Sequence, residues 1–208
     1  MRWWLPLVAT ALVAAELPKI TFTKSFPGSE PAYIEIAVDK DGHGVYKEAP
    51  NDDSPLEFHL AAAETEAVFD LGAKLGHFSQ PLESGLKVAF MGDKTFRWEQ
   101  GAEKREVKFN YSTNPDAQQL LDWFERMAET EQRFATLDRA VHHDNLGVND
   151  ALLGMEISLD RKRLVALDQF LPLLDRVAGS ERYMHIARER AAALAGAIRN
   201  PPPKAPAQ

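Results

Sequence analysis

The sequence predicts an α+β protein, with an antiparallel β-sheet of about six or seven strands, one inserted helix and a C-terminal bundle of about four helices. Two patterns predict this fold class. Over residues 16–113, apolar residues mostly alternate with polar ones, which is the period of half-buried strands. Over residues 114–199, apolar residues recur at spacings of three and four, the period of one helix face. Because few residues separate the two regions, we expect them to pack together as one domain.

The first fifteen residues, 1–15, predict a cleavable secretory signal peptide. Met1-Arg2 supplies a positive charge, Trp3–Leu12 is apolar apart from Thr10, and Val13-Ala14-Ala15 supplies small residues for cleavage. The apolar run is shorter than the roughly 20 residues that span a bilayer, so we expect no membrane span after cleavage. The protein is therefore expected to be exported, to the periplasm or to the exterior of the cell.

The composition excludes several kinds of site and partner. The 208 residues contain no cysteine, which excludes disulfides, a thiol nucleophile and thiolate metal ligands. The formal net charge is −7, and removal of the signal would take away one further positive charge with Arg2. An acidic chain is a poor match for nucleic acid or anionic lipid, so we expect neither as the main partner.

Four short strands are predicted in the first part of the strand-rich region, around residues 20–26, 33–38, 45–46 and 56–60. Between the second and the third, Asp39-Lys40-Asp41-Gly42 is typical of a hairpin turn, because aspartate bonds to nearby backbone and glycine allows positive φ. The same residues resemble the start of a calcium-binding loop. That loop requires glutamate at its twelfth position, where this chain has Pro50, so the hairpin is the favoured interpretation.

The inserted helix is predicted over residues 62–76, where apolar residues recur at helical spacing until Gly76 and Pro81 end the pattern. Two further strands are predicted around residues 87–90 and 94–99. A turn and a partner strand that ends near Tyr111 complete the sheet.

The helical region begins with the clearest local signal in the chain. In Asn114-Pro115-Asp116, asparagine is a favoured N-cap, proline fits the first helical position and aspartate complements the helix dipole, so a helix is predicted from residue 115 to about 141. Further helices are predicted at residues 148–158, 168–178 and 181–198. Pro172 is expected to kink the second of these or delay its start, and Ser180 to cap the third. Residues 200–208 are rich in proline and predict a disordered tail.

Two groups of polar residues in the helical region are candidate metal or proton-transfer sites. Glu181, His185 and Glu189 are spaced i, i+4 and i+8, so a helix would bring them to one face. The alternative is a solvated helix face whose charges pair with nearby arginines. His142-His143 lies at the end of the long helix. Adjacent side chains on a helix point about 100° apart, so they rarely bind one metal ion together. The helix dipole by itself also favours histidine at this end.

Aromatic residues are numerous in the strand-rich region, and most are expected in the core. Phe96, Trp98 and Tyr111 lie on two neighbouring predicted strands. If their side chains point to solvent, they form an exposed aromatic strip that could bind a sugar or a peptide. The sequence contains no G-x-S-x-G, G-x-G-x-x-G or P-loop motif. We therefore assign no catalytic, cofactor-binding or metal-binding residue from the sequence.

Turn and core residues in the run that begins at Lys19 form a pattern of strands, a D-x-D-G turn and a helix. The pattern comprises Phe26-Pro27-Gly28-Ser29, Tyr33-Ile34-Glu35-Ile36, Asp39-Lys40-Asp41-Gly42, Tyr46 and Phe69-Asp70-Leu71. In this pattern the chain resembles uncharacterised exported bacterial proteins of unknown function. The resemblance implies no activity, because no catalytic residue belongs to the pattern.

Two functions from different classes follow as hypotheses. The first is a non-enzymatic binding or interaction protein of the cell envelope, whose partner would be an envelope protein, a peptide or a glycan. It is favoured because the sequence contains no catalytic constellation. The second is a metal-dependent hydrolase that uses His185 with Glu181 and Glu189, or His142-His143. The hydrolase requires these groups to converge with a residue of the sheet in one pocket.

Overall fold

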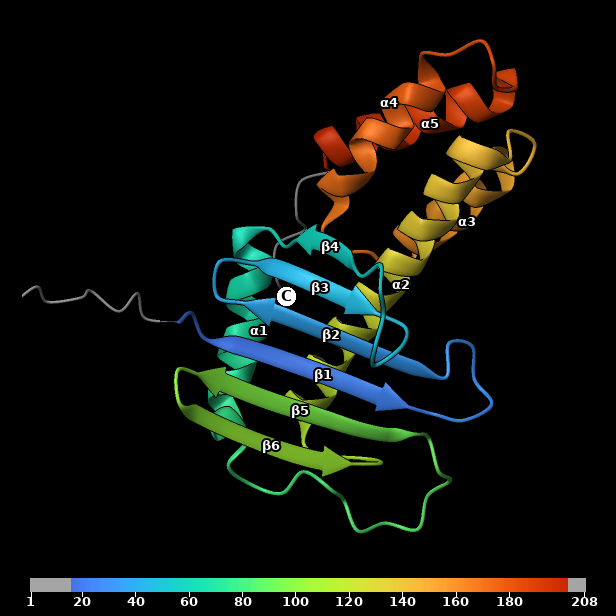
Figure 1. Ribbon diagram of the computed structural model, residues 1–208. Coiled ribbons are helices and arrows are strands. Elements are labelled where there is room, and N and C mark those ends of the chain that lie inside the picture. The colour runs from blue at the N-terminus through green and yellow to red at the C-terminus, as the bar shows by residue number, and fades with distance from the viewer. Residues whose placement is uncertain (1–15, 202–208) are drawn as a thin grey trace, which may run out of the picture.

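The computed structural model describes residues 16–201, which form a six-stranded antiparallel sheet, five α-helices and two short 3₁₀ helices (Figure 1). The elements follow in the order β1 (Lys19–Ser25), β2 (Tyr33–Asp39), β3 (His43–Lys47), β4 (Leu56–His59), α1 (Ala62–Lys74), η1 (Gly76–Phe78), β5 (Asp93–Gln100), β6 (Glu103–Phe109), α2 (Pro115–His143), α3 (Val148–Asp160), η2 (Leu167–Phe170), α4 (Leu171–Ala178) and α5 (His185–Arg199). The predicted α+β fold with a helical C-terminal part is confirmed. The predictions for residues 1–15 and for the tail from residue 202 onward lie outside the described residues.

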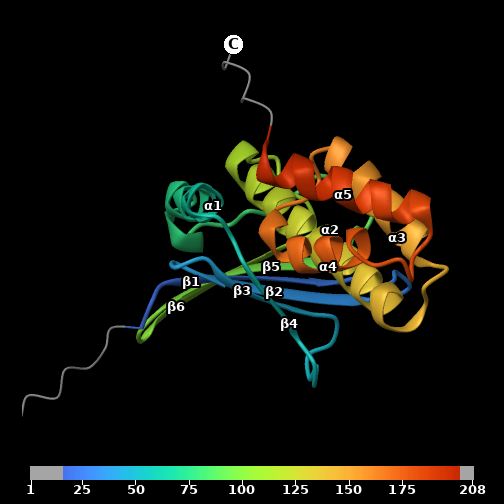
Figure 2. The same ribbon diagram turned by 90° about the horizontal axis from the view of Figure 1, so that it is seen from above.

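Strand β1 lies near the centre of the sheet, whose strand order is β4-β3-β2-β1-β5-β6. Strands β1 to β4 form a meander, and the segment that contains α1 then returns the chain to the other side of β1, where β5 and β6 form a hairpin. Helix α1 and the first half of α2 cover one face of the sheet, and the other face is open (Figure 2). Side chains alternate accordingly, so Ile20 and Phe22 are buried under the helices while Thr23 points to the open face.

The turn between β2 and β3 is a plain hairpin, as predicted. Asp39 Oδ1 accepts hydrogen bonds from the backbone N–H groups of Asp41 and His43, each at 3.0 Å. Gly42 has a φ of 90°, and a Cβ added to it would lie 2.7 Å from Thr65 Oγ1 of α1. The turn therefore requires glycine both for its backbone conformation and for its contact with the helix.

Aromatic rings form the centre of the core between the sheet and its helices. The ring of Phe96 is fully buried, and its centroid lies 5.6 Å from that of Phe22 and 5.9 Å from that of Phe124. Trp98 is also buried and packs edge-on against Phe69. Because Phe96 and Trp98 face inward, the exposed aromatic strip considered from the sequence does not form, and core packing is the confirmed interpretation.

Most helix boundaries agree with the sequence predictions. The side chain of Asn114 accepts hydrogen bonds from the N–H groups of Asp116 and Ala117 at 2.9 and 3.2 Å, so it is the predicted N-cap of α2. Helix α4 begins at Leu171 with Pro172 in its first turn, which confirms that this proline delays the start of the helix.

Helix α2 takes part in two hydrophobic cores. Its first half, including Leu120 and Phe124, packs in the core under the sheet. Its second half contributes Leu137 and Val141 to a second core, all of whose residues belong to the helical region. This second core lies beyond β4 (Figure 1). We call the second half of α2, together with α3, η2, α4 and α5, the helical arm.

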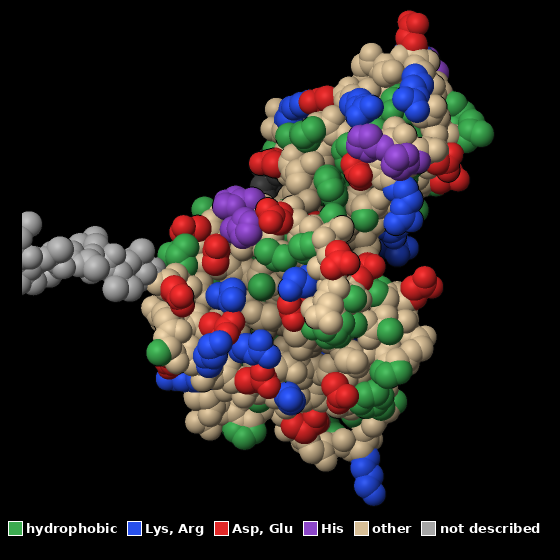
Figure 3. Space-filling view, in the orientation of Figure 1, with side chains coloured by type: hydrophobic (Ala, Val, Ile, Leu, Met, Phe, Trp, Pro, Cys, Tyr) green, Lys and Arg blue, Asp and Glu red, His purple; other side chains and the backbone are tan. Residues whose placement is uncertain are grey.

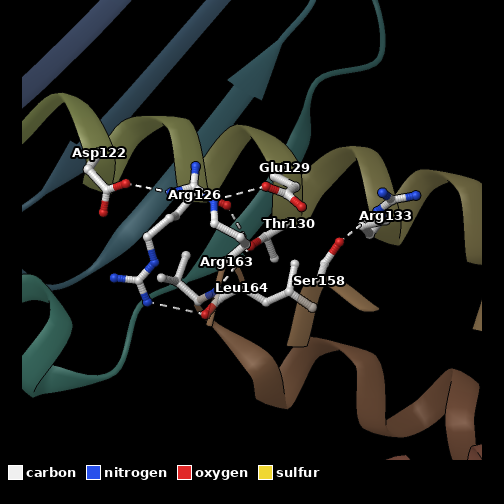
Figure 4. Close-up of polar contacts among 9 residues, drawn as sticks. Asp122, Arg126, Glu129, Thr130, Arg133, Ser158, Arg163 and Leu164 are labelled. Carbon is white, nitrogen blue, oxygen red and sulfur yellow. Dashed lines mark hydrogen bonds and ion pairs between the residues drawn. The ribbon is translucent and has the colours of Figure 1, made fainter. Parts of the chain in front are cut away.

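A set of polar contacts, which we call the polar seam, separates the two cores where the segment after α3 crosses α2 (Figure 4). Arg163 forms ion pairs with Asp122 at 2.5 Å and with Glu129 at 3.1 Å. Thr130 is fully buried, and its Oγ1 accepts a hydrogen bond from the backbone N–H of Val165 at 3.0 Å. These contacts hold the segment between α3 and η2 against the middle of α2.

The predicted strand at residues 87–90 is wrong, because this part of the chain is a loop. The side chain of Asn110 takes the place of a strand partner: its Oδ1 accepts from the N–H of Met91 at 2.7 Å, and its Nδ2 donates to the carbonyl of Ala89 at 3.1 Å. Gly85 and Gly92 both have positive φ, which interrupts an extended run on either side.

The last helix begins later than predicted, at His185 and not at residue 181. Ser180 caps only a short turn, in which its Oγ accepts from the N–H of Arg182 at 3.4 Å. The physical reason is the anchoring of Tyr183, which is buried and donates from its hydroxyl to the carbonyl of Val141 at 3.1 Å. The chain reaches α2 at this residue and turns before α5 starts.

Replacing Gly44 by alanine is expected to lower the free energy of unfolding by about 1–3 kcal/mol, the usual cost of overpacking. A Cβ at Gly44 would overlap the ring of Phe58, which lies opposite it on β4. The control is Gly196→Ala in α5, where nothing lies within 4 Å of the added Cβ, and it should raise stability by about 0.5–1 kcal/mol. Urea unfolding followed by circular dichroism measures both. Equal stability of the Gly44→Ala protein and the parent would contradict this packing.

Candidate functional site

The predicted face of Glu181, His185 and Glu189 does not form. Glu181 precedes α5, whereas His185 and Glu189 lie in its first two turns. His185 Nδ1 is 3.2 Å from Glu189 Oε2, and the two side chains are 73% and 68% exposed. The alternative interpretation agrees in that this face is solvated, but the two side chains pair with each other, and Arg190 pairs with Glu156 of α3.

His142 and His143 lie at the C-terminal end of α2, as predicted, with ring centroids 6.1 Å apart. His142 Nδ1 is 3.1 Å from Asp138 Oδ1, and its Nε2 contacts Arg176 at 3.1 Å. Over residues 16–201, no three side chains of His, Asp or Glu are grouped so that they could hold a metal ion. Within the same residues, every helix is too short or too polar to cross a membrane.

The open face of the sheet is charged, but its charges are already paired. Figure 3 shows acidic and basic side chains interspersed over this face. Glu99 lies 2.9 Å from Lys104 and 3.1 Å from Lys19, and these contacts lower the pKa of its carboxyl group. Arg97 and Glu106 form a further pair at 2.8 Å. Such a pattern is typical of a solvated face, so we do not place the site here.

A groove follows one face of α2 from the sheet to the helical arm. It consists of four adjoining hollows of about 290, 580, 360 and 310 Å³. Lys24 and Glu125 line both the first and the second hollow. Gln132 and Thr136 line the second and the third, and Arg139 lines the third and the fourth. We call the four hollows together the α2 groove.

The helical wall of the α2 groove is one continuous stripe of residues. They recur at spacings of three and four, so they lie on one helix face: Gln118, Leu121, Glu125, Ala128, Gln132, Ala135, Arg139 and His143. At 1.5 Å per residue the stripe is roughly 40 Å long. The facing wall comes from strands, with Lys24 of β1, Ile34 of β2, Tyr46 of β3 and Leu56 of β4.

Four cations of the groove are not engaged in ion pairs with any described residue, and one of them, Lys94, is held by backbone carbonyls, which leaves Lys24, Arg133 and Arg139. Arg133 instead donates from its Nε to Ser158 Oγ at 3.1 Å. Arg163, in contrast, is already paired in the polar seam. In a chain that is acidic overall, these cations are free to pair with anionic groups of a ligand.

Tyr46 connects the two walls of the groove. Its hydroxyl donates to Glu48 Oε1 at 2.7 Å and accepts a hydrogen bond from Gln132 Nε2 at 3.2 Å. Burial raises the pKa of Tyr46 well above its usual value, and the bond to Glu48 raises it further. The hydroxyl therefore stays protonated and acts as a fixed spacer between β3 and α2.

The first hollow is the most apolar, and it lies beside an exposed apolar loop. Lys94 lines this hollow, but its Nζ donates to the carbonyls of Asn110 at 2.8 Å and Met91 at 3.2 Å, and burial lowers its pKa. This lysine therefore holds the loop and is not free for a ligand. The exposed apolar residues of the loop are Leu86, Val88, Phe90 and Met91.

Comparison with protein-family models gives no match for this chain, and comparison with curated proteins gives none either. The geometry of the groove therefore carries the functional argument. Of the residues considered from the sequence, Tyr111 and His143 line the groove, at its opposite ends. Lys24, Arg133 and Arg139 do not stand out in the sequence, because cations beside the apolar face of a helix are also typical of a solvated surface.

Glu131 of α2 is fully buried, and its carboxylate is only half satisfied. Its Oε1 accepts a hydrogen bond from Gln169 Nε2 at 2.9 Å. Its Oε2 and the side-chain oxygen of Gln169 have no partner among the described residues. Burial raises the pKa of Glu131 to about 7, and the hydrogen bond from Gln169 opposes this rise.

Replacing Glu131 by glutamine is expected to raise the free energy of unfolding at about pH 8 by up to about 3 kcal/mol. The pKa of about 7 in the folded protein exceeds the ordinary value of 4.5. The unfolded chain therefore loses this proton first, and stability falls as pH rises from about 4.5 to 7. Below this range both states hold the proton, so the variant and the parent should differ little. Urea unfolding across this range measures the difference.

The matched control for this experiment is Glu189→Gln, which changes an exposed carboxylate and should leave the pH dependence unaltered. If Glu131→Gln raised the free energy of unfolding by the same amount at every pH, this would contradict a raised pKa for Glu131.

Proposed function

We propose that the protein is a non-enzymatic binding protein of the cell envelope and that the α2 groove holds its partner. The continuity of the groove carries this proposal, since shared lining residues join its four hollows along one stripe of α2. The predicted signal peptide supports the location in the envelope.

The shape of the groove favours a polypeptide partner over a small molecule. Small-molecule sites are mostly apolar, concave and able to bury most of the ligand. Here the hollows are open along α2, and most of them mix polar with apolar lining residues. An extended chain rises about 3.3 Å per residue, so roughly ten residues would fill the length of the groove.

The charges of the groove favour a partner segment that contains acidic residues. Lys24, Arg133 and Arg139 are the side chains available to pair with them, since each lacks an ion-pair partner among residues 16–201. Glu125 lies beside Lys24 in the first two hollows and would favour a basic or neutral residue at that end. Carboxylates line the other end as well, namely Glu48 and Asp52 in the third hollow and Asp138 in the fourth, but Tyr46, backbone N–H groups and His142 already engage them.

A photo-crosslinking residue placed at Thr136, an exposed position of the groove, is expected to capture one or a few defined proteins from a native envelope extract. The control is the same residue at Thr23, on the open face of the sheet. Mass spectrometry of the adducts identifies the partner and the peptide captured. Equal labelling from both positions would contradict the groove as the binding site.

The charge-reversed variant Arg139→Glu is expected to lower the yield of the adduct at Thr136 roughly tenfold, because an attraction becomes a repulsion. The matched control is Lys108→Glu, which reverses an exposed cation of β6 on the open face. An unchanged yield with Arg139→Glu, or an equal loss with Lys108→Glu, would count against the proposal.

A further inference from the structure

We infer that the partner binds as a β-strand added to the open edge of β4. The inference rests on the proposed function, because it specifies how a polypeptide would occupy the end of the α2 groove beside β4, its third and fourth hollows. Three features of the structure carry it: the phase of the hydrogen bonds of β4, the contrast between the two edges of the sheet, and the position of β4 as a wall of the groove.

Alternate residues of β4 have backbone N–H and C=O groups that do not bond to β3. Among residues 16–201, β3 is the one strand that pairs with β4, and the N–H of Leu60, just past the end of β4, donates to the carbonyl of Gly42 at 2.9 Å. Hydrogen-bonded and non-hydrogen-bonded pairs alternate along an antiparallel ladder, so Phe58 also directs its backbone groups toward β3. Glu57 and His59 consequently direct theirs away from β3, and these groups have no partner among the described residues.

The two edges of the sheet differ in how they resist pairing with another chain. Edge strands are commonly protected by charged side chains. In β6, five of the seven residues are Glu, Lys or Arg. In β4, Glu57 is the single residue of that kind, and it stands between Leu56 and Phe58. The charge pattern therefore blocks strand addition at β6 and permits it at β4.

One side chain of β4 lines the α2 groove. Leu56 lines both the third and the fourth hollow, together with Ala135 and Arg139 of α2. A strand paired with β4 would lie about 4.8 Å beyond it in the plane of the sheet, next to the third and fourth hollows that Leu56 lines. The helical arm rises on this side of the sheet (Figure 1) and brings Phe134 to the fourth hollow.

The alternation of side chains on a strand then defines the ligand. Every second residue of the added strand faces the hollows, where Leu56 and Phe134 favour an apolar side chain and Arg139 favours a carboxylate. The residues between them face solvent, beside Glu57 and His59. The preferred ligand is therefore an extended segment of roughly four to six residues, with an apolar and an acidic residue two positions apart.

The first experiment uses a displayed library of random peptides of roughly 12 residues, selected against the exported chain beginning at Glu16. The strongest peptide is then synthesised with a methyl group on one backbone nitrogen at a time. In a strand only every second N–H points to the partner strand, so methylation should weaken binding roughly tenfold at alternate positions and hardly at all between them. A loss without this period of two would overturn strand addition.

The second experiment changes β4 itself. His59→Pro removes a backbone N–H that points away from β3. Because proline is tolerated at such a position of an edge strand, the fold should be retained. His59→Ala keeps the N–H and is the matched control. The selected peptide should bind the proline variant roughly tenfold more weakly than the alanine variant. Equal affinity would overturn the inference, and circular dichroism verifies that both variants are folded.

The outcomes separate this inference from the proposed function. If the peptide is weakened by Arg139→Glu but shows neither the period of two nor an effect of His59→Pro, the groove binds a polypeptide and strand addition is wrong. If Arg139→Glu has no effect on any selected peptide, or if the library yields no binder, the proposed function is wrong and the inference fails with it.

Discussion

Helix α2 carries apolar residues along its whole length, but the sheet covers only the first half of it. Leu120 and Phe124 are buried under the sheet, whereas Leu137 and Val141 require a second cover, which α3, α4 and α5 provide. A helix buries its apolar face because the transfer of that surface out of water is the main stabilising contribution to folding. Helices α3, α4 and α5 bury this second half. The polar seam around Arg163 and Thr130 lies between the two cores.

The same constraint leaves β4 open and creates the groove beside it. Because α3, α4 and α5 surround the second half of α2, they lie beyond the edge of the sheet, and β4 has β3 as its one strand partner among the described residues (Figure 1). Leu56 of β4 and Arg139 of α2 then line the same two hollows. A buried and poorly satisfied Glu131 lies where the two cores meet, so part of the stability of this junction depends on pH.

Local sequence signals predicted most elements, and tertiary contacts explain the failures. The cap at Asn114 and the turn at Asp39 depend on bonds to residues two to four positions away, so they can be read from the chain. Residues 87–90 have the alternation of a strand, but a strand requires a neighbouring strand, and Asn110 supplies side-chain bonds instead. The start of the last helix depends on Tyr183 reaching Val141, a contact across 42 positions that no local pattern contains.

The sequence by itself determined the fold class and the order of most elements, because hydrophobic periodicity and capping are local properties of the chain. Only the tertiary structure decided which polar residues form a site. The Glu181, His185 and Glu189 spacing depends on a helix that starts too late. The groove, in contrast, joins Lys24 and Leu56 to a stripe on α2 that lies far from them in sequence. Such proximity follows from how the sheet and the helix pack, and spacing along the chain does not encode it.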